Sequence, residues 1–168
     1  KKIFTGFKGG CLTVDGYAGY DALGDPKKTN QPWGITYCWT HWRRRFVEYS
    51  RTTESPVCTE MTERIGQLYQ IEAEIRGKDP KTRRAIRQKL SKPIVDALRP
   101  WLEAQLDMLS SSSDLTRHIR YGLKRWHGLT RFLDDGRLEM DTNAVENAIR
   151  PIPVGWSLCT PFVSAWKH

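Results

Sequence analysis

Two acidic residues, Asp15 and Glu146, stand in local settings suited to metal chemistry. Asp15 follows a short apolar run, residues 11–14, which glycines bound on both sides and which predicts a β-strand. Glu146 is the one carboxylate in residues 142–150, a segment expected to form a short helix. Carboxylates far apart in sequence can converge in a fold and hold a divalent cation through their oxygen atoms. In a strongly basic chain, this pairing suggests chemistry on nucleic acid.

Each of the two carboxylates also has a plain structural explanation. An aspartate at the end of a strand is held rigidly, as a metal ligand must be. Asp15 could instead start a turn or cap the following helix, and the local sequence favours this structural role. Asn143 and Glu146 have the spacing of a helix capping box, so capping and metal binding stay equally open. Arg150, one turn further on, could pair with Glu146 or contact a phosphate.

Cys38 and His41 have the spacing of half a zinc site. The sequence contains no second pair of this kind, so we expect Cys38 to be a core residue and His41 a local hydrogen-bonding group. The four cysteines are widely spaced, which favours reduced thiols over a disulfide framework.

Composition narrows the class of partner. The chain has 168 residues, enough for one domain with a core, and a formal net charge of +8, which favours a polyanion. It has no apolar stretch of about 18 residues, so no membrane span is expected. Basic residues gather in two groups and after His41, and together they favour phosphate contacts, although a solvated helix face explains each one singly. The groups are Lys81, Arg83, Arg84, Arg87, Lys89 and Lys92, and then Arg117, Arg120 and Lys124.

The element order predicts an α/β layer followed by a helical block. Strands are expected at residues 11–14 and 35–39, with helices at 17–23 and 42–51. Long helices begin at residue 59, and a second helical stretch, 81–109, should kink or break near Pro93 and Pro100. Ser113 or Asp114 should cap the next helix. Its buried face would consist of Leu115, Ile119, Leu123 and Trp126.

Five segments, in the same order, resemble the catalytic region of the insertion-sequence-sixty-six family of bacterial transposases, within the DDE superclass. They are residues 14–23 (VDGYAGYDAL), 37–44 (YCWTHWRR), 68–77 (LYQIEAEIRG), 132–139 (FLDDGRLE) and 141–151 (DTNAVENAIRP). The resemblance implies an RNase H-like α/β core with a helical insertion before the glutamate-bearing helix. It also implies an Asp-Asp-Glu triad that binds two Mg²⁺ or Mn²⁺ ions, with Asp15 as the second aspartate and Glu146 as the glutamate.

The implied activity is DNA strand cleavage and strand transfer at transposon ends, by a protein of the bacterial cytoplasm associated with the nucleoid. Arg43, Arg44 and Arg150 are the candidate DNA contacts. Further copies of the chain, or other transposition proteins, are candidate partners. On this resemblance, residues 1–56 would be the second half of the core, 57–133 the insertion, 134–152 the returning helix and 153–168 a tail that departs from the family pattern.

The first triad aspartate would lie upstream of Lys1. We therefore expect this chain to be a fragment of a transposase catalytic domain that is inactive by itself. The alternative is a non-catalytic DNA-binding or assembly remnant.

Overall fold

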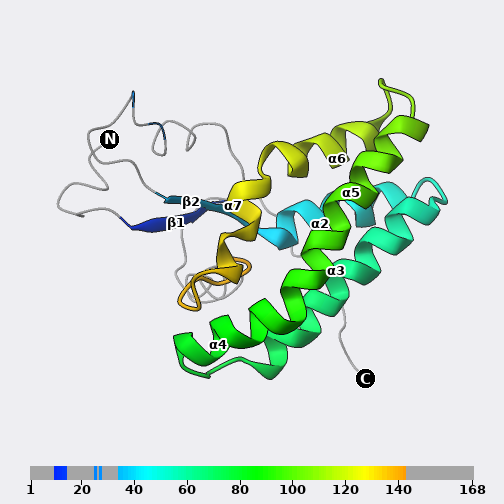
Figure 1. Cartoon of the computed structure of the whole chain (residues 1–168). Helices are drawn as coiled ribbons and strands as arrows, with labels where there is room; N and C mark the ends of the chain where they lie inside the picture. The colour runs from blue at the N-terminus through cyan, green and yellow to red at the C-terminus, as the bar shows by residue number, and fades with distance from the viewer. Residues whose placement is uncertain (1–9, 15–24, 26, 28–33, 143–168) are drawn as a thin grey trace, which may run out of the picture.

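The computed structural model describes residues 10–14, 25, 27 and 34–142. Two short strands, β1 (Cys11–Val14) and β2 (Gly34–Tyr37), pair in parallel, with Cys11 opposite Gly34 and Val14 opposite Tyr37 (Figure 1). Both strands were predicted, but β2 ends two residues early because Trp39 already begins a helix. In a parallel pair both carboxyl ends lie at one edge of the sheet, so Val14 and Tyr37 end the two strands side by side.

Most of the rest of the described chain is helical (Figure 1). Its elements are α2 (Trp39–Ser50), α3 (Pro56–Glu74), α4 (Pro80–Ile86), the π-helical η2 (Arg87–Ser91), α5 (Lys92–Met108), α6 (Asp114–Lys124), α7 (Trp126–Thr130) and the 3₁₀ turn η3 (Arg131–Leu133). The predicted helical character of residues 59–132 is confirmed, since no strand occurs in that fully described span. The described structure is thus mixed α/β, mostly helical, while the RNase H-like core and the domain limits stay predictions.

The predicted kink or break near each proline is not a break, since helical structure is continuous from α4 through η2 and α5. Pro93 occupies the first turn of α5, where a missing N–H costs little. The irregularity lies before it, in the wider turn of η2. Pro100 lies inside α5 without ending it, and both Pro100 and Asp96, whose carbonyl loses its partner, are exposed to water. Water can therefore replace the lost backbone hydrogen bond.

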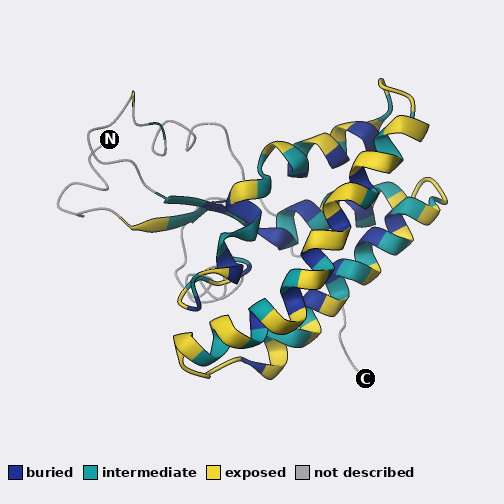
Figure 2. Ribbon diagram, in the orientation of Figure 1, coloured by how far each residue is buried: buried dark blue, intermediate teal, exposed yellow. Residues whose placement is uncertain are grey.

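Helix α2 forms the centre of the core (Figure 2). Its residues Trp39, Trp42 and Phe46 are fully buried against apolar side chains of α3, α5, α6 and α7. Both buried indole N–H groups donate to backbone carbonyls, Trp39 to Leu129 at 2.8 Å and Trp42 to His118 at 2.9 Å. Burying two large rings with satisfied donors fixes α6 and α7 in place on α2.

Helix α6 begins as predicted and buries half of the face expected for it. The Ser113 hydroxyl accepts the N–H of Thr116 at 3.1 Å, so Ser113, not Asp114, caps the helix. Of the predicted apolar face, Leu115 and Ile119 are buried. The other two, Leu123 and Trp126, are only partly buried where they pack against the core.

A buried ion pair attaches residues 131–139 to the helical body. The guanidinium of Arg87 is fully buried and makes two hydrogen bonds to Glu72, of 2.6 and 2.7 Å. It also donates to the carbonyls of Phe132 and Asp135. Three of the six residues in the basic run, Arg83, Arg87 and Lys92, are therefore in ion pairs within the chain. Arg87 is fully buried and cannot reach a phosphate, so the run cannot contribute as a whole, and phosphate contacts of its exposed members stay a prediction.

Replacing Glu72 by Gln should destabilise the fold strongly, because it leaves the Arg87 charge buried without a counter-ion. We expect a loss of about 3–5 kcal/mol in the free energy of unfolding, measured by urea titration. The matched control is Glu103→Gln, which removes an exposed i,i+4 pair with Arg99 and should cost about 0.5 kcal/mol or less. Equal effects of the two substitutions would contradict the assigned role of Glu72.

Candidate functional site

The junction between β2 and α2 joins two distant parts of the chain. The N–H of Cys38 donates to the carbonyl of Val14 at 3.0 Å, and the N–H of Trp39 donates to the carbonyl of Met140 at 3.1 Å. The Cys38 sulfur accepts the backbone N–H and the hydroxyl of Thr142 at 3.4 and 3.5 Å. The end of β1 and residues 140–142 are therefore held on the same two residues.

The predicted ligands Asp15 and Glu146, and the predicted DNA contact Arg150, lie outside the described residues. Their described neighbours can still be located. Val14 directly precedes Asp15, and Thr142 lies four residues before Glu146, a length of chain that reaches at most about 14 Å. Both neighbours contact Cys38, so the chain enters the two predicted ligand positions from one place in the fold. Because a shared ion needs both carboxylates within reach, we predict that the two carboxyl groups approach to within roughly 8 Å.

Asp141, beside this junction, is held by a hydrogen-bonded chain from two helices. The Thr40 hydroxyl donates to Oδ2 of Asp141 at 3.2 Å and lies 2.6 Å from the phenol oxygen of Tyr69. Either hydroxyl can donate the hydrogen bond between Thr40 and Tyr69. Burial raises the pKa of Tyr69 well above its usual range, the hydrogen bond with Thr40 opposes this, and the nearby Asp141 charge adds to it, so the phenol stays protonated.

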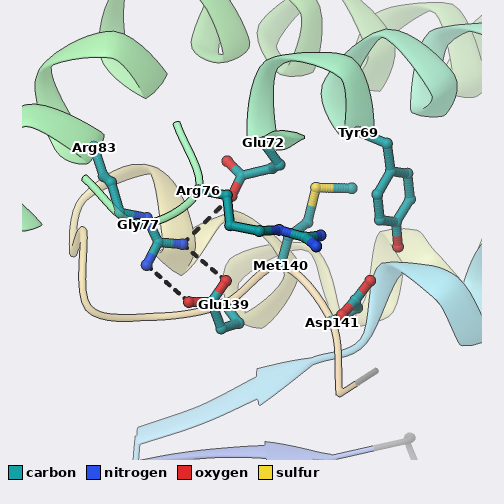
Figure 3. Close-up of a pocket in the computed structure, with 8 residues that line it drawn as sticks. All are labelled: Tyr69, Glu72, Arg76, Gly77, Arg83, Glu139, Met140 and Asp141. Carbon is teal, nitrogen blue, oxygen red and sulfur yellow. Dashed lines mark hydrogen bonds and ion pairs between the residues drawn. The ribbon is translucent and has the colours of Figure 1, made fainter. Parts of the chain in front are cut away.

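A pocket of about 160 Å³ lies next to Asp141 (Figure 3). Arg83 crosses it and makes two hydrogen bonds to Glu139, of 2.7 and 2.8 Å, with Glu72 3.5 Å away on the other side. The hydrogen bonds with Arg83 lower the pKa of Glu139. In the described part of the chain, no three His, Cys, Asp or Glu side chains gather as a metal site would require. Two of the pocket carboxylates, Glu72 and Glu139, are therefore paired with arginine, while the third, Asp141, accepts a hydrogen bond from Thr40.

Four residues singled out in the sequence analysis are described, and they differ in burial: Cys38, His41, Arg43 and Arg44. Cys38 is buried, as expected of a core cysteine, and its sulfur accepts a hydrogen bond from Thr142. His41 is partly buried, and no metal-binding group forms around the two among residues 34–142. Arg44 is exposed on α2 and Arg43 is partly buried. Their contact with DNA stays a prediction.

Sequence reasoning missed Thr40, Tyr69 and Asp141 as parts of the site. All three lie in segments that carry the family resemblance, which was the available signal. Nothing in their local spacing shows that Thr40 and Asp141 meet, because 101 residues separate them.

In the described residues, no helix has the length and apolar composition needed to cross a bilayer.

The fold and site define a mostly helical α/β protein in which a small parallel sheet is tied, at its carboxyl edge, to a basic helical body. The family model described as "Transposase IS66 family" matches residues 1–166. The chain belongs to this family, which confirms the resemblance seen in its motifs. The match includes most of residues 153–168, the segment for which a departure from the family pattern was predicted.

Three proteins of Sinorhizobium fredii, each named only as an uncharacterized protein, are similar to the chain. The protein y4jD is 37% identical over 145 residues, which cover 85% of this chain and 28% of y4jD. The protein y4qI is 39% identical over 145 residues, with 84% and 27% covered, and y4hP is 35% identical over 159 residues, with 88% and 29% covered. The chain thus spans less than a third of each relative. No solved structure matches it significantly.

Asp135 and Arg137 form a charged turn whose contribution to the stability of the fold should depend on pH. The Asp135 carboxylate accepts the Arg137 backbone N–H and three side-chain hydrogen bonds of 2.7–3.2 Å. These bonds lower the pKa of Asp135 to about 2. A lowered carboxyl pKa stabilises the fold above the unfolded value of about 3.9, and this contribution disappears as pH falls toward 2.

Replacing Asp135 by Asn should therefore lower stability at pH 6, and the deficit should shrink as the pH falls from about 4 toward 2. Urea midpoints of the variant and the wild type across this range provide the measurement. Asp107→Asn, at an exposed position on α5, is the control and should show no such convergence. A deficit that is the same at pH 6 and pH 2 would show that the carboxylate charge is not the cause.

Proposed function

We propose that the protein containing this chain cleaves DNA strands and transfers them at transposon ends, with Asp15 and Glu146 as ligands of Mg²⁺ or Mn²⁺. The observation that supports this most is the β2–α2 junction. There, the backbone N–H of Cys38 donates to Val14, directly before Asp15. The sulfur of the same Cys38 accepts a hydrogen bond from Thr142, four residues before Glu146. A shared metal centre requires the two carboxylates to converge, and a common anchor for the segments that lead to them favours this convergence.

The ligand chemistry fits the ions. Carboxylate oxygens are the donors that Mg²⁺ and Mn²⁺ prefer, and the two proposed ligands are carboxylates. When bound, such ions make water or a DNA 3′-hydroxyl a better nucleophile and stabilise the leaving oxygen of an in-line displacement. The contribution of the chain is placement: Cys38 and Trp39 fix where the two ligand segments begin, and the Tyr69–Thr40–Asp141 chain fixes the segment that leads to Glu146.

The proposed core and partners follow from the proposed transposase activity. Strands β1 and β2 would belong to an RNase H-like sheet, with residues 57–133 inserted before the glutamate-bearing helix. The net charge of +8 supports DNA as the partner, and further copies of the protein or other transposition proteins would complete the assembly. A protein acting on the bacterial chromosome would work in the cytoplasm.

Metal binding by the two proposed ligands can be measured directly. Titration of Mn²⁺ into the chain, followed by the loss of the free-ion paramagnetic resonance signal, should reveal a site that Asp15→Asn and Glu146→Gln each weaken at least about tenfold, as expected when a ligand is lost. The matched controls are Asp96→Asn and Glu103→Gln on the exposed surface of α5. Wild-type affinity in both ligand variants would overturn the assignment.

The activity is best tested in a protein of the relatives' length. The 168 residues would replace the corresponding region of y4qI, and Mg²⁺-dependent nicking of a labelled transposon end would be followed. We expect activity in this chimera, and a loss of at least about 10²-fold in its Glu146→Gln variant, because the loss of a metal ligand misplaces the attacking oxygen. Retained DNA binding without cleavage in a folded chimera would favour the non-catalytic alternative.

A further inference from the structure

Helix α5, with the π-helical turn before it, carries an apolar face that is exposed to solvent. Leu90 and Met108, which are 42% and 71% exposed, are the two large apolar residues that are exposed in the described chain. The residues between them on this face are exposed as well, and they are Pro93, Ala97, Pro100 and Ala104. One exposed apolar residue needs no explanation, but a continuous row of six does.

The spacing of these six residues places them on one side of the helix. Successive members lie three or four residues apart, the repeat that brings side chains onto a common helix face. The buried residues Val95, Leu98 and Leu102 form a separate row that packs on the core. Helix α5 therefore has two apolar faces, of which one is buried and the other is exposed in the described structure (Figure 2).

Trp101 lies at the border of the exposed face. It is partly exposed, and its spacing makes it a helix-surface neighbour of both Ala97 and Ala104. The guanidinium carbon of Arg64, on α3, lies 4.9 Å from the centre of its ring and holds the ring at this border. A partly exposed tryptophan beside apolar surface is a common anchor of protein interfaces.

The form of the exposed face fits another helix as its partner. Steps that alternate between three and four residues make the row along which two helices pack. The short side chains of Ala97 and Pro100 at the centre allow two backbones to approach, and Leu90 and Met108 can fill the space where two crossing helices diverge. From residue 90 to residue 108 the face is about 27 Å long.

Two charges of opposite sign lie at the two ends of this face. The charges in the middle of α5 are already in i,i+4 pairs within the helix, Lys92 with Asp96 and Arg99 with Glu103. Lys89 directly precedes Leu90, and Asp107 directly precedes Met108. Both are exposed and have no ion pair within the described residues.

This order of charges favours a second copy of the chain in the antiparallel direction. When two α5 helices lie antiparallel with Leu90 of each copy against Met108 of the other, Lys89 and Asp107 meet at both ends. A parallel pair would instead place lysine against lysine and aspartate against aspartate, which is unfavourable. The face is thus complementary to itself, as the contact in a two-fold dimer must be.

We propose that two copies of this chain associate through the exposed face of α5, with the two helices antiparallel about an axis midway between Leu90 and Met108. The inference goes beyond the proposed DNA chemistry, because the contact needs neither metal nor DNA, and it identifies the surface by which a further copy joins. One helix pair covers less than the roughly 800 Å² per partner of a standard interface, so the dimer should form at micromolar concentrations.

Sedimentation equilibrium of the 168-residue chain, without DNA or added metal, measures the dissociation constant of the dimer. Ala97→Glu places a carboxylate at the centre of the face, and Ala73→Glu makes the same change at an exposed position of α3 as the matched control. We expect the wild type and Ala73→Glu to dimerise alike. Ala97→Glu should weaken the dimer at least about 30-fold, because association would bury an unpaired charge.

Exchanging the end charges tests the direction of the two helices. Lys89→Glu places carboxylates together at both ends and should weaken the dimer by about fivefold, the size expected of two exposed pairs. Adding Asp107→Lys to this variant restores opposite charges in the antiparallel dimer, so the double variant should return to the wild-type dissociation constant. In a parallel dimer the second change would bring no recovery.

The outcomes separate this inference from the proposed function. A wild-type chain that stays monomeric up to about 0.5 mM would overturn the dimer and leave the face to another segment of the longer protein. Wild-type dimerisation of Ala97→Glu, shown by circular dichroism to be folded, would overturn the surface. If Ala97→Glu fails to fold, the charge exchange at the two ends still tests the contact. The Mn²⁺ titration and the nicking assay do not depend on any of these results.

Discussion

The two backbone hydrogen bonds made by Cys38 and Trp39 are the contacts on which the candidate site depends. Both N–H groups lie at the start of α2, where the first turn of a helix has no internal acceptor for them. One is satisfied by Val14 in the neighbouring strand and the other by Met140, more than 100 residues away along the chain. The unsatisfied end of a helix thereby becomes the point at which the sheet and the returning segment are joined.

The helical body holds residues 131–139, which lead to this junction, in place. Residues 131–139 carry little apolar surface beyond Phe132, Leu133 and Leu138, and they are held instead by arginines of α4 and η2. Arg87 satisfies two carbonyls of this segment and Glu72 together, and Arg83 reaches Glu139. A buried guanidinium with several acceptors is costly to disturb, which favours a single arrangement of the segment that leads to Glu146.

Local patterns predicted the elements well, because strands and helices depend on nearby residues. The strand at 11–14, the cap at Ser113 and the helices after residue 59 all follow from short-range chemistry. Helix α5 does not break at Pro100, and both Pro100 and Asp96, whose carbonyl loses its partner, are exposed, a tertiary property that the local sequence does not show. The contacts of Cys38 with Thr142 and of Thr40 with Asp141 join residues more than 100 positions apart, so no spacing rule could have found them. Local patterns singled out Asp15 and Glu146, and the family resemblance favoured metal binding over a turn and a capping box.

Tertiary contacts also distinguish the arginines from one another, although each adds the same single charge to the net charge. Arg87 and Arg83 are absorbed by carboxylates, and their positive charge is balanced within the fold. Arg45 and Arg125 instead stack on the ring of Tyr121, at 4.0 and 4.2 Å from its centre. The neighbours of each arginine therefore indicate its role better than its position in a basic run does.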